Sequence, residues 1–167
     1  MLDVTVGRAV VLGVGNILNR DEGLGVHAVG MLRDRLGDRE SLECVDGGVL
    51  GLNLLSLVEA CEHLLVLDAV DRGAAPGTPV EVPGEEIALF SGVKMSQHQI
   101  TFQEVLGLAA VRDRLPSHLH LLGVQPADLS IGLGMTPIVE AAVPAVLDRA
   151  LEVLSEWGLL GETLPCA

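Results

Sequence analysis

The sequence predicts a three-layer α/β/α sandwich built on a mostly parallel sheet of about five strands. Apolar runs of strand length alternate along the chain with stretches in which apolar residues recur at helical spacing, as is typical of a parallel α/β sheet. The length of 167 residues suits a single hydrophobic core, and the sequence contains neither an internal repeat nor a linker between domains. Hydrophobic residues make up 49% of the chain, which is ample to fill such a core. We therefore expect residues 1–167 to form one domain.

The first half of the chain contains three predicted strands. Residues 9–14 are apolar or glycine throughout, which favours a strand buried on both faces. Residues 42–45 and 64–69 form the second and third strands. A helix follows each of the first two strands, with apolar positions at Leu24, Ala28, Met31, Leu32 and Leu36 in the first helix and at Leu52, Leu55 and Val58 in the second.

The second half begins with a segment rich in Gly and Pro, residues 71–98, which contains one short edge strand near 78–82. A third helix is expected over about 101–112 and a further strand over 119–124. The last helix starts at Thr136, with proline in its first turn, where a missing N–H costs little. Its apolar stripe consists of Val139, Val143, Val146, Leu147, Ala150, Leu151 and Leu154.

Composition excludes two classes of partner. The chain has two Phe, one Trp and no Tyr, which leaves almost nothing for stacking nucleobases, and its formal charge of −13 repels phosphates and anionic lipid. No apolar run approaches the ~20 residues of a spanning helix, and the N-terminal residues carry no basic region of a secretory signal. We expect a cytoplasmic protein that binds neither nucleic acid nor membrane.

The three cysteines do not form a metal or redox motif. Cys44, Cys61 and Cys166 are odd in number and far apart, and no CxxC pair occurs. Cys44 lies in a predicted strand and Cys61 in a predicted helix, so we interpret both as small core residues in a reducing compartment.

Acidic residues follow three of the predicted strands. Glu22 lies in the segment after the first strand, Asp46 ends the second strand and Asp68 ends the third. A single Asp at a strand end is ordinary, because it often caps or turns the chain there. In a parallel sheet, however, these ends meet at one edge, where ligands bind, and three like charges repel one another unless a cation intervenes. The pattern therefore indicates a site for a divalent cation.

His98, at the end of the long polar segment, is the best candidate for an additional neutral ligand. His27 is expected within the first helix, and His63 precedes the third strand at the opposite edge. His118 and His120 share one face of a strand and could bind metal, but they lie near its amino end.

Glu22, Asp68 and His98 would supply two carboxylates and one imidazole. Three protein ligands leave a position open for water or substrate, as in functional rather than structural metal sites. This set of ligands suits zinc, nickel or cobalt and does not choose among them.

Two other active sites are disfavoured. Gly13 and Gly15 resemble part of a dinucleotide fingerprint, but its third glycine would fall at Leu18, and Asp21 and Glu22 would repel a pyrophosphate. A serine hydrolase is disfavoured because the chain has no G-x-S-x-G elbow.

Several segments together resemble the nickel–iron hydrogenase maturation endopeptidases, in that family's order and approximate spacing. They are GVGNILNRDEGLGVH at 13–27, Asp46-Gly47-Gly48, the strand ending on Asp68, His98-Gln99 and Gly123-Val124-Gln125-Pro126. One departure is that the segment 131–137 looks longer than the family's usual turn before the last helix.

The resemblance implies an activity. Such enzymes remove a short C-terminal extension from the hydrogenase large-subunit precursor after nickel has been inserted. By motif matching, Glu22, Asp68 and His98 occupy the family's three metal-contacting positions, and Asp46 matches the acid beside them. Nickel would be supplied by the precursor, although another divalent ion such as zinc or cadmium could occupy the site in vitro.

These inferences lead to one mechanism and one competing hypothesis. Nickel docked on the three ligands would act as a Lewis acid, with a carboxylate, Glu22 or Asp68, as base. An acid–base role for Asp46 without metal contact is equally open. The competing hypothesis is a non-catalytic nickel sensor or chaperone on the same scaffold.

Overall fold

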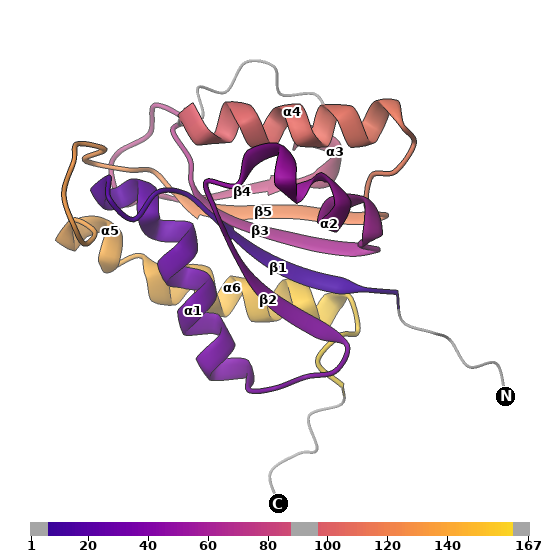
Figure 1. The fold of residues 1–167 in the computed structure, drawn as a ribbon. Coiled ribbons are helices and arrows are strands. Elements are labelled where there is room, and N and C mark those ends of the chain that lie inside the picture. The colour runs from indigo at the N-terminus through magenta and orange to yellow at the C-terminus, as the bar shows by residue number, and fades with distance from the viewer. Residues whose placement is uncertain (1–6, 88–96, 162–167) are drawn as a thin grey trace, which may run out of the picture.

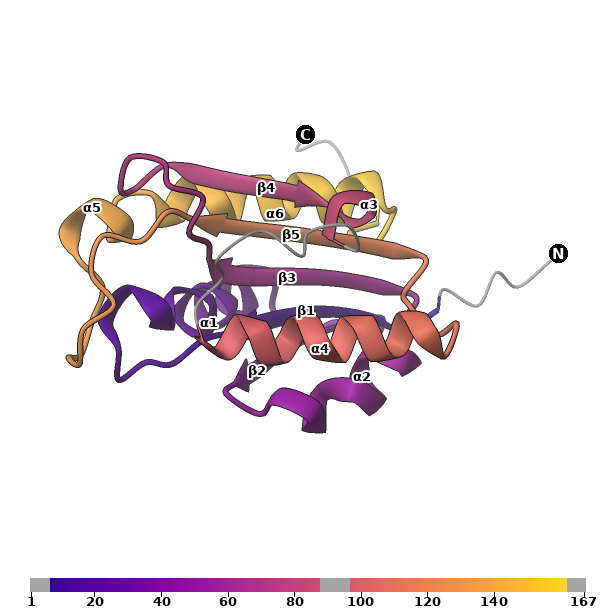
Figure 2. The same cartoon turned by 90° about the horizontal axis from the view of Figure 1, so that it is seen from above.

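The computed structural model describes residues 7–87 and 97–161, and for residues 97–101 it describes the backbone alone. One sheet has the strand order β2-β1-β3-β5-β4. Its strands are β1 (Ala9–Val14), β2 (Leu42–Gly48), β3 (His63–Ala69), β4 (Pro79–Pro83) and β5 (His118–Val124). All neighbouring strands pair in parallel except β4, which is antiparallel to β5 (Figure 2). The predicted mostly parallel sheet of about five strands is confirmed.

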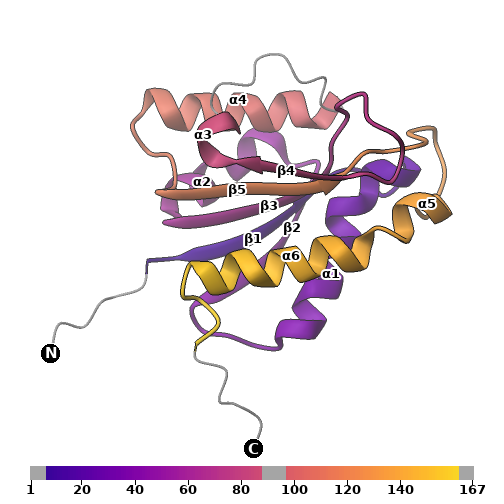
Figure 3. The ribbon, with the colours of Figure 1, turned by 180° about the vertical axis from the view of Figure 1, so that it is seen from behind.

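Helices cover both faces of this sheet (Figures 1 and 3). α1 (Leu24–Leu36) and α6 (Val143–Glu156) lie on one face, and α2 (Leu55–Ala60) and α4 (Gln97–Val111) lie on the other. Each face carries its own core of buried aliphatic side chains, which includes Val11 and Leu147 on the α1/α6 side and Val10 and Phe102 on the α2/α4 side. The predicted three-layer architecture is therefore confirmed.

Four short helical segments complete the described chain: η1 (Arg20–Gly23), η2 (Gly51–Leu54), α3 (Gly84–Ile87) and α5 (Pro137–Glu140). None of the helices in the described ranges is long and apolar enough to cross a membrane.

Two predicted helix boundaries were wrong. The third helix, α4, begins at Gln97 rather than near residue 101, so His98 belongs to its first turn and not to a loop. The last helix is divided into α5 and α6 by a turn at residues 141–142. Pro144 explains the division, because it has no N–H to donate to the carbonyl of Glu140. The apolar stripe of this helix is buried as predicted, except that Leu151 is partly exposed.

β4 is an edge strand that begins and ends with proline. Val80 and Val82 are buried against the core, whereas Glu81 and both prolines, Pro79 and Pro83, are exposed. β4 therefore presents alternating apolar and polar side chains to its two faces.

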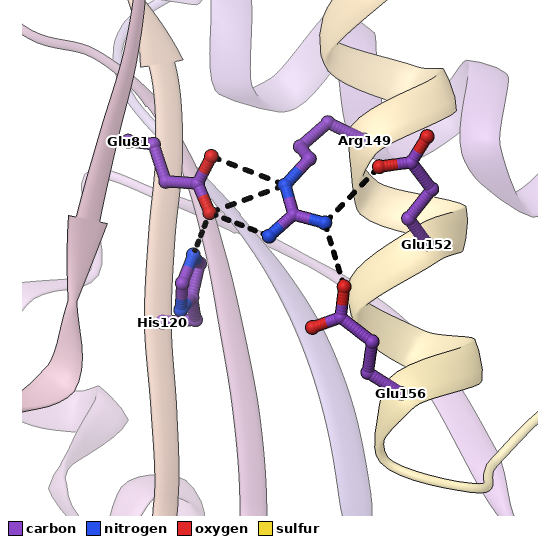
Figure 4. A network of polar contacts seen from close by, with 5 residues as sticks. All are labelled: Glu81, His120, Arg149, Glu152 and Glu156. Carbon is purple, nitrogen blue, oxygen red and sulfur yellow. Dashed lines mark hydrogen bonds and ion pairs between the residues drawn. The ribbon is translucent and has the colours of Figure 1, made fainter.

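A network of ion pairs connects α6 to the β4 edge of the sheet (Figure 4). Nη2 of Arg149 lies 2.8 Å from Oε1 of Glu81, and its Nη1 reaches Glu156 at 2.9 Å and Glu152 at 3.1 Å. Nε2 of His120 lies 2.7 Å from the same Glu81 oxygen. One arginine thus joins three carboxylates from two elements.

Candidate active site at the carboxyl ends of the parallel strands

The parallel strands β1, β2, β3 and β5 all end at one edge of the sheet. The arrowheads of β3 and β5 mark this edge in Figure 2, and α4 begins there. The segments that follow these strands therefore surround one region, which is where open parallel sheets bind ligands.

Two carboxylates are buried at this edge. Glu22 lies on η1, which follows β1, and is 5% exposed; Asp68 lies near the end of β3 and is 1% exposed. η1 contacts β3, so the two acids come from neighbouring elements. Oδ1 of Asp68 accepts a hydrogen bond of 2.7 Å from the backbone N–H of Ala69, which orients the carboxylate. Buried carboxylates are costly unless cations or hydrogen bonds compensate them, so this pair marks a specialised region.

Gly15 lies between these two acidic residues. Its φ is +135°, and its N–H donates a 3.0 Å hydrogen bond to the carbonyl of Gly48. A Cβ at this position would lie 1.9 Å from the carbonyl oxygen of Glu22 and 3.7 Å from Oδ1 of Asp68. Only glycine lets the backbone at position 15 pass this close to the carbonyl of Glu22 in this conformation.

Asp21, the neighbour of Glu22, holds a distant loop against η1. Its fully buried carboxylate accepts backbone hydrogen bonds from Ala127 and Asp128, both 2.9 Å, and from Thr136 at 2.7 Å. The Thr136 hydroxyl donates to the same carboxylate, although this residue occupies the N-cap position of α5. Sequence reasoning missed this role and treated Asp21 only as one more acid. Nothing in the spacing indicates it, because the partners are 106 to 115 residues away.

The same loop also pairs with the first loop through its backbone. The N–H of Gly132 donates to Leu18 O at 2.8 Å, and the N–H of Arg20 donates to Gly132 O at 3.0 Å. Nε of Arg20 lies 3.3 Å from Oδ2 of Asp128. The segment before the last helix is thus fixed to the loop that leads into η1, the element that carries Glu22.

His98 is the second residue of α4, and its side chain lies outside the described part of the structure. Its backbone belongs to the turn with which α4 begins at this edge. Val66 and Val70 lie two residues before and two residues after Asp68, and both belong to the core beneath α2 and α4. By that alternation, Asp68 faces the layer that contains α4.

Asp46 is exposed and lies on the other face of the sheet. Leu42 and Cys44 of the same strand pack into the α1/α6 core, whereas Val45 packs into the α2/α4 core. By this alternation Asp46 faces the α1/α6 side, so the sheet lies between it and the face of Asp68. The predicted grouping of all three acids is therefore incomplete, and a catalytic role for Asp46 stays a prediction.

The remaining histidines follow the sequence analysis in part. His27 lies within α1, and His63 lies at the opposite edge of the sheet, as expected. The rings of His118 and His120 have different partners: the first stacks on His63 and the second contacts Glu81. An H-x-H metal pair is therefore not favoured.

The predicted core roles of two cysteines are confirmed. Cys61 is buried, its thiol contacts the carbonyl of Leu57 at 3.0 Å, and burial raises its pKa to about 11. Cys44 is half-buried against the α1/α6 core, and burial raises its pKa as well. Neither thiol is therefore a ready nucleophile. Cys166 lies outside the described residues.

The family indicated by the motifs can be compared with known proteins. A family model described as hydrogenase maturation protease matches residues 26–153. A hydrogenase expression/formation protein, HupD of Bradyrhizobium diazoefficiens, is 43% identical over 154 residues, which is 91% of this chain and 80% of that protein. The hydrogenase 2 maturation protease of Escherichia coli is 39% identical over 160 residues, 95% of this chain and 96% of that protein.

A solved structure agrees with these sequence relatives. The hydrogenase maturating endopeptidase HybD from Escherichia coli matches with a TM-score of 0.85 and 38% identity, covering 90% of this chain and 94% of HybD. The chain therefore belongs to the hydrogenase maturation protease family and is an endopeptidase.

Proposed function

We propose that this endopeptidase removes the C-terminal extension of a nickel–iron hydrogenase large-subunit precursor after nickel has been inserted. The observation that carries this proposal is the pair of buried carboxylates, Glu22 and Asp68, at the carboxyl edge of the sheet. Membership of the hydrogenase maturation proteases supports the kind of substrate. In this proposal nickel belongs to the substrate, because the precursor brings it.

The set of ligands supports nickel recognition. Glu22 and Asp68 offer carboxylate oxygens and His98 offers an imidazole, which together suit nickel, zinc or cobalt. A divalent cation would offset the cost of burying two carboxylates at one edge. Three ligands from the protease leave room for ligands from the precursor. The precursor would therefore bind the protease strongly only when it carries the metal.

Hydrolysis then needs a base and a positioned water. Bound nickel supplies Lewis-acid chemistry at the carbonyl or at the water. Glu22 or Asp68 takes the proton of the attacking water and passes it to the leaving amine. The exposed position of Asp46 on the other face of the sheet favours a role without direct metal contact.

Exposed apolar side chains around the same edge support a protein substrate. We call them the apolar rim. Burial of exposed apolar side chains favours association of proteins, so each of them that the precursor covers would favour its docking. They follow β1, β2 and β5 in the chain: Ile17, Leu18, Val49, Leu50, Leu52, Leu129, Ile131, Leu133 and Ile138.

The test is cleavage of a nickel-loaded precursor by single variants. Glu22→Gln, Asp68→Asn and His98→Ala each remove one ligand, so we expect processing to fall by at least about 100-fold. Asp148→Asn is the matched control, because that carboxylate is exposed on α6, and its processing rate should equal the wild type. Near-normal cleavage by the His98 variant would contradict the assigned site. Failure of the wild-type chain to cleave, with nickel binding intact, would instead support a nickel sensor or chaperone.

A further inference from the structure

A second group of metal-ligating side chains lies at the amino ends of β3 and β5, opposite the candidate active site. Glu62, His63 and His118 each offer one ligand atom, and these atoms all lie within 4.8 Å of one another. We propose that this group binds a divalent transition-metal ion of the zinc type, independently of the proposed nickel recognition.

Backbone hydrogen bonds fix the positions of all three residues. His63 and His118 are directly opposite each other in the parallel pair β3–β5. The N–H of His118 donates to Glu62 O at 3.0 Å. The N–H groups of Glu62 and His63 both donate to Arg8 O, at 2.9 and 3.2 Å. Side chains at such positions need little backbone movement to share an ion.

The histidine rings form a stack with one buried member. Their centroids are 4.2 Å apart and their planes differ by 9°, with Trp157 beside both rings at 5.5 and 5.9 Å. His63 is 7% exposed, and its Nδ1 has no hydrogen-bond partner within the described structure. Buried polar atoms nearly always have a partner, so this nitrogen is an independent sign of a missing one.

The chemistry of the group fits zinc or nickel. Two imidazoles and one carboxylate leave a fourth position open for water or for a donor from another molecule. Metal–ligand distances of about 2.0–2.2 Å require the three ligand atoms to move closer together. Glu62 and His118 are exposed and can rotate to do so.

His120 provides a matched control. It lies two residues from His118 on the same strand, but its Nε2 contacts Glu81 at 2.7 Å.

A zinc ion held as proposed would join β3, β5 and the residue before β3, and would therefore raise the thermal midpoint of the folded chain.

The experiment uses the full chain with His98→Ala, which weakens the other candidate metal site. Zinc is titrated by calorimetry into this chain, and into the same chain with His118→Gln or with His120→Gln. We expect zinc to bind the His98→Ala chain and its His120→Gln variant equally. Zinc should bind the His118→Gln variant at least about tenfold more weakly. Zinc should raise the thermal midpoint of the His98→Ala chain and of its His120→Gln variant, but not that of the His118→Gln variant. Thermal midpoints measured without zinc show whether all three proteins fold.

Three results would overturn the proposal. They are the absence of zinc binding in the His98→Ala chain, undiminished zinc binding after His118→Gln, and weakening by His120→Gln as large as that by His118→Gln. The last result would assign the ion to the H-x-H pair instead. Precursor cleavage by His118→Gln in an otherwise wild-type chain should be normal, which separates this site from the proposed active site.

Discussion

Gly15 shows how closely the backbone approaches the two buried acids. Alanine at this position would place its Cβ 1.9 Å from Glu22 O in a backbone conformation that L-residues rarely adopt. We expect Gly15→Ala to lower the free energy of unfolding by about 1–3 kcal/mol and to displace Glu22, so that precursor cleavage is lost. Denaturant unfolding and a cleavage assay measure the two effects.

Gly30 is the control for that substitution. It lies inside α1, and a Cβ there would meet no atom within 4 Å. Gly30→Ala should therefore stabilise the fold by about 0.5–1 kcal/mol through helix propensity, with normal cleavage. Equal stability losses in the two variants would show that the close approach at Gly15 has no energetic effect.

The positions of Glu22 and Asp68 at one edge could be predicted because parallel strands end together. The separation of Asp46 could not be predicted from that rule alone, since it depends on which face of β2 each side chain takes. The contact between Asp21 and Thr136 was equally hidden, because only the folded chain brings residues 115 positions apart together.

At the scale of elements, Asp21 connects the loop before α5 to η1. Asparagine at position 21 would present an NH2 group to backbone N–H donors that now share a carboxylate. Asp21→Asn should lower the free energy of unfolding by about 1–3 kcal/mol and speed amide hydrogen exchange at Ala127, Asp128 and Thr136. Exchange at these amides is measured by NMR, with the exposed Asp38→Asn as control. Unchanged exchange would mean that the backbone pairing at Gly132 holds the loop alone.

The ion-pair network on α6 should make the free energy of unfolding depend on pH. The hydrogen bonds from Arg149, helped by His120 and opposed by partial burial, hold the pKa of Glu81 below its ordinary value of 4.5. A depressed carboxyl pKa stabilises the fold above the ordinary value, and the contribution disappears as pH falls through the folded-state pKa. Because Glu81 is 39% exposed, solvent screening limits the effect to about 0.2–1 kcal/mol.

Glu81→Gln tests this expectation. The difference in unfolding free energy between wild type and variant should be larger at pH 7 than at pH 3, as measured by denaturant unfolding at both values. Glu40→Gln, at an exposed position outside the network, should show no such trend. A difference that does not change with pH would assign the effect of Glu81 to packing.

Element types were predicted better than element ends. Residues 9–14 and the helix that starts at Leu24 were correct because their apolar periodicity is long and clear. The start of α4 was placed too late because the polar residues before it resemble a loop. The division before α6 was missed because Pro144 interrupts a stripe that is otherwise regular.

For the whole molecule, a core lies on each face of the sheet, so a substitution inside a core should change stability without changing the activity of the folded chain. Val146 is 3% exposed in the α1/α6 core, far along the chain from the acids. Val146→Ala should lower the free energy of unfolding by roughly 1–3 kcal/mol by opening a cavity, while the folded fraction cleaves normally. Thermal midpoints and cleavage rates, normalised to folded protein, measure both. A loss of specific activity would couple this core to the site.

The architecture itself could be predicted because alternating strands and helices leave few ways to bury two helical layers on one sheet. The antiparallel pairing of β4 with β5 could not be predicted in this way, since it depends on how the long segment after β3 returns to the edge.

The prolines at both ends of β4 also affect how separate molecules meet. An edge strand can recruit a strand from a neighbouring molecule, and continued recruitment leads to aggregation. Neither Pro79 nor Pro83 can donate a backbone hydrogen bond, and the charged Glu81 lies between them. The sheet therefore ends at β4 as a finite unit. When several copies of the chain crowd together, this edge does not favour joining of their sheets into a continuous fibre.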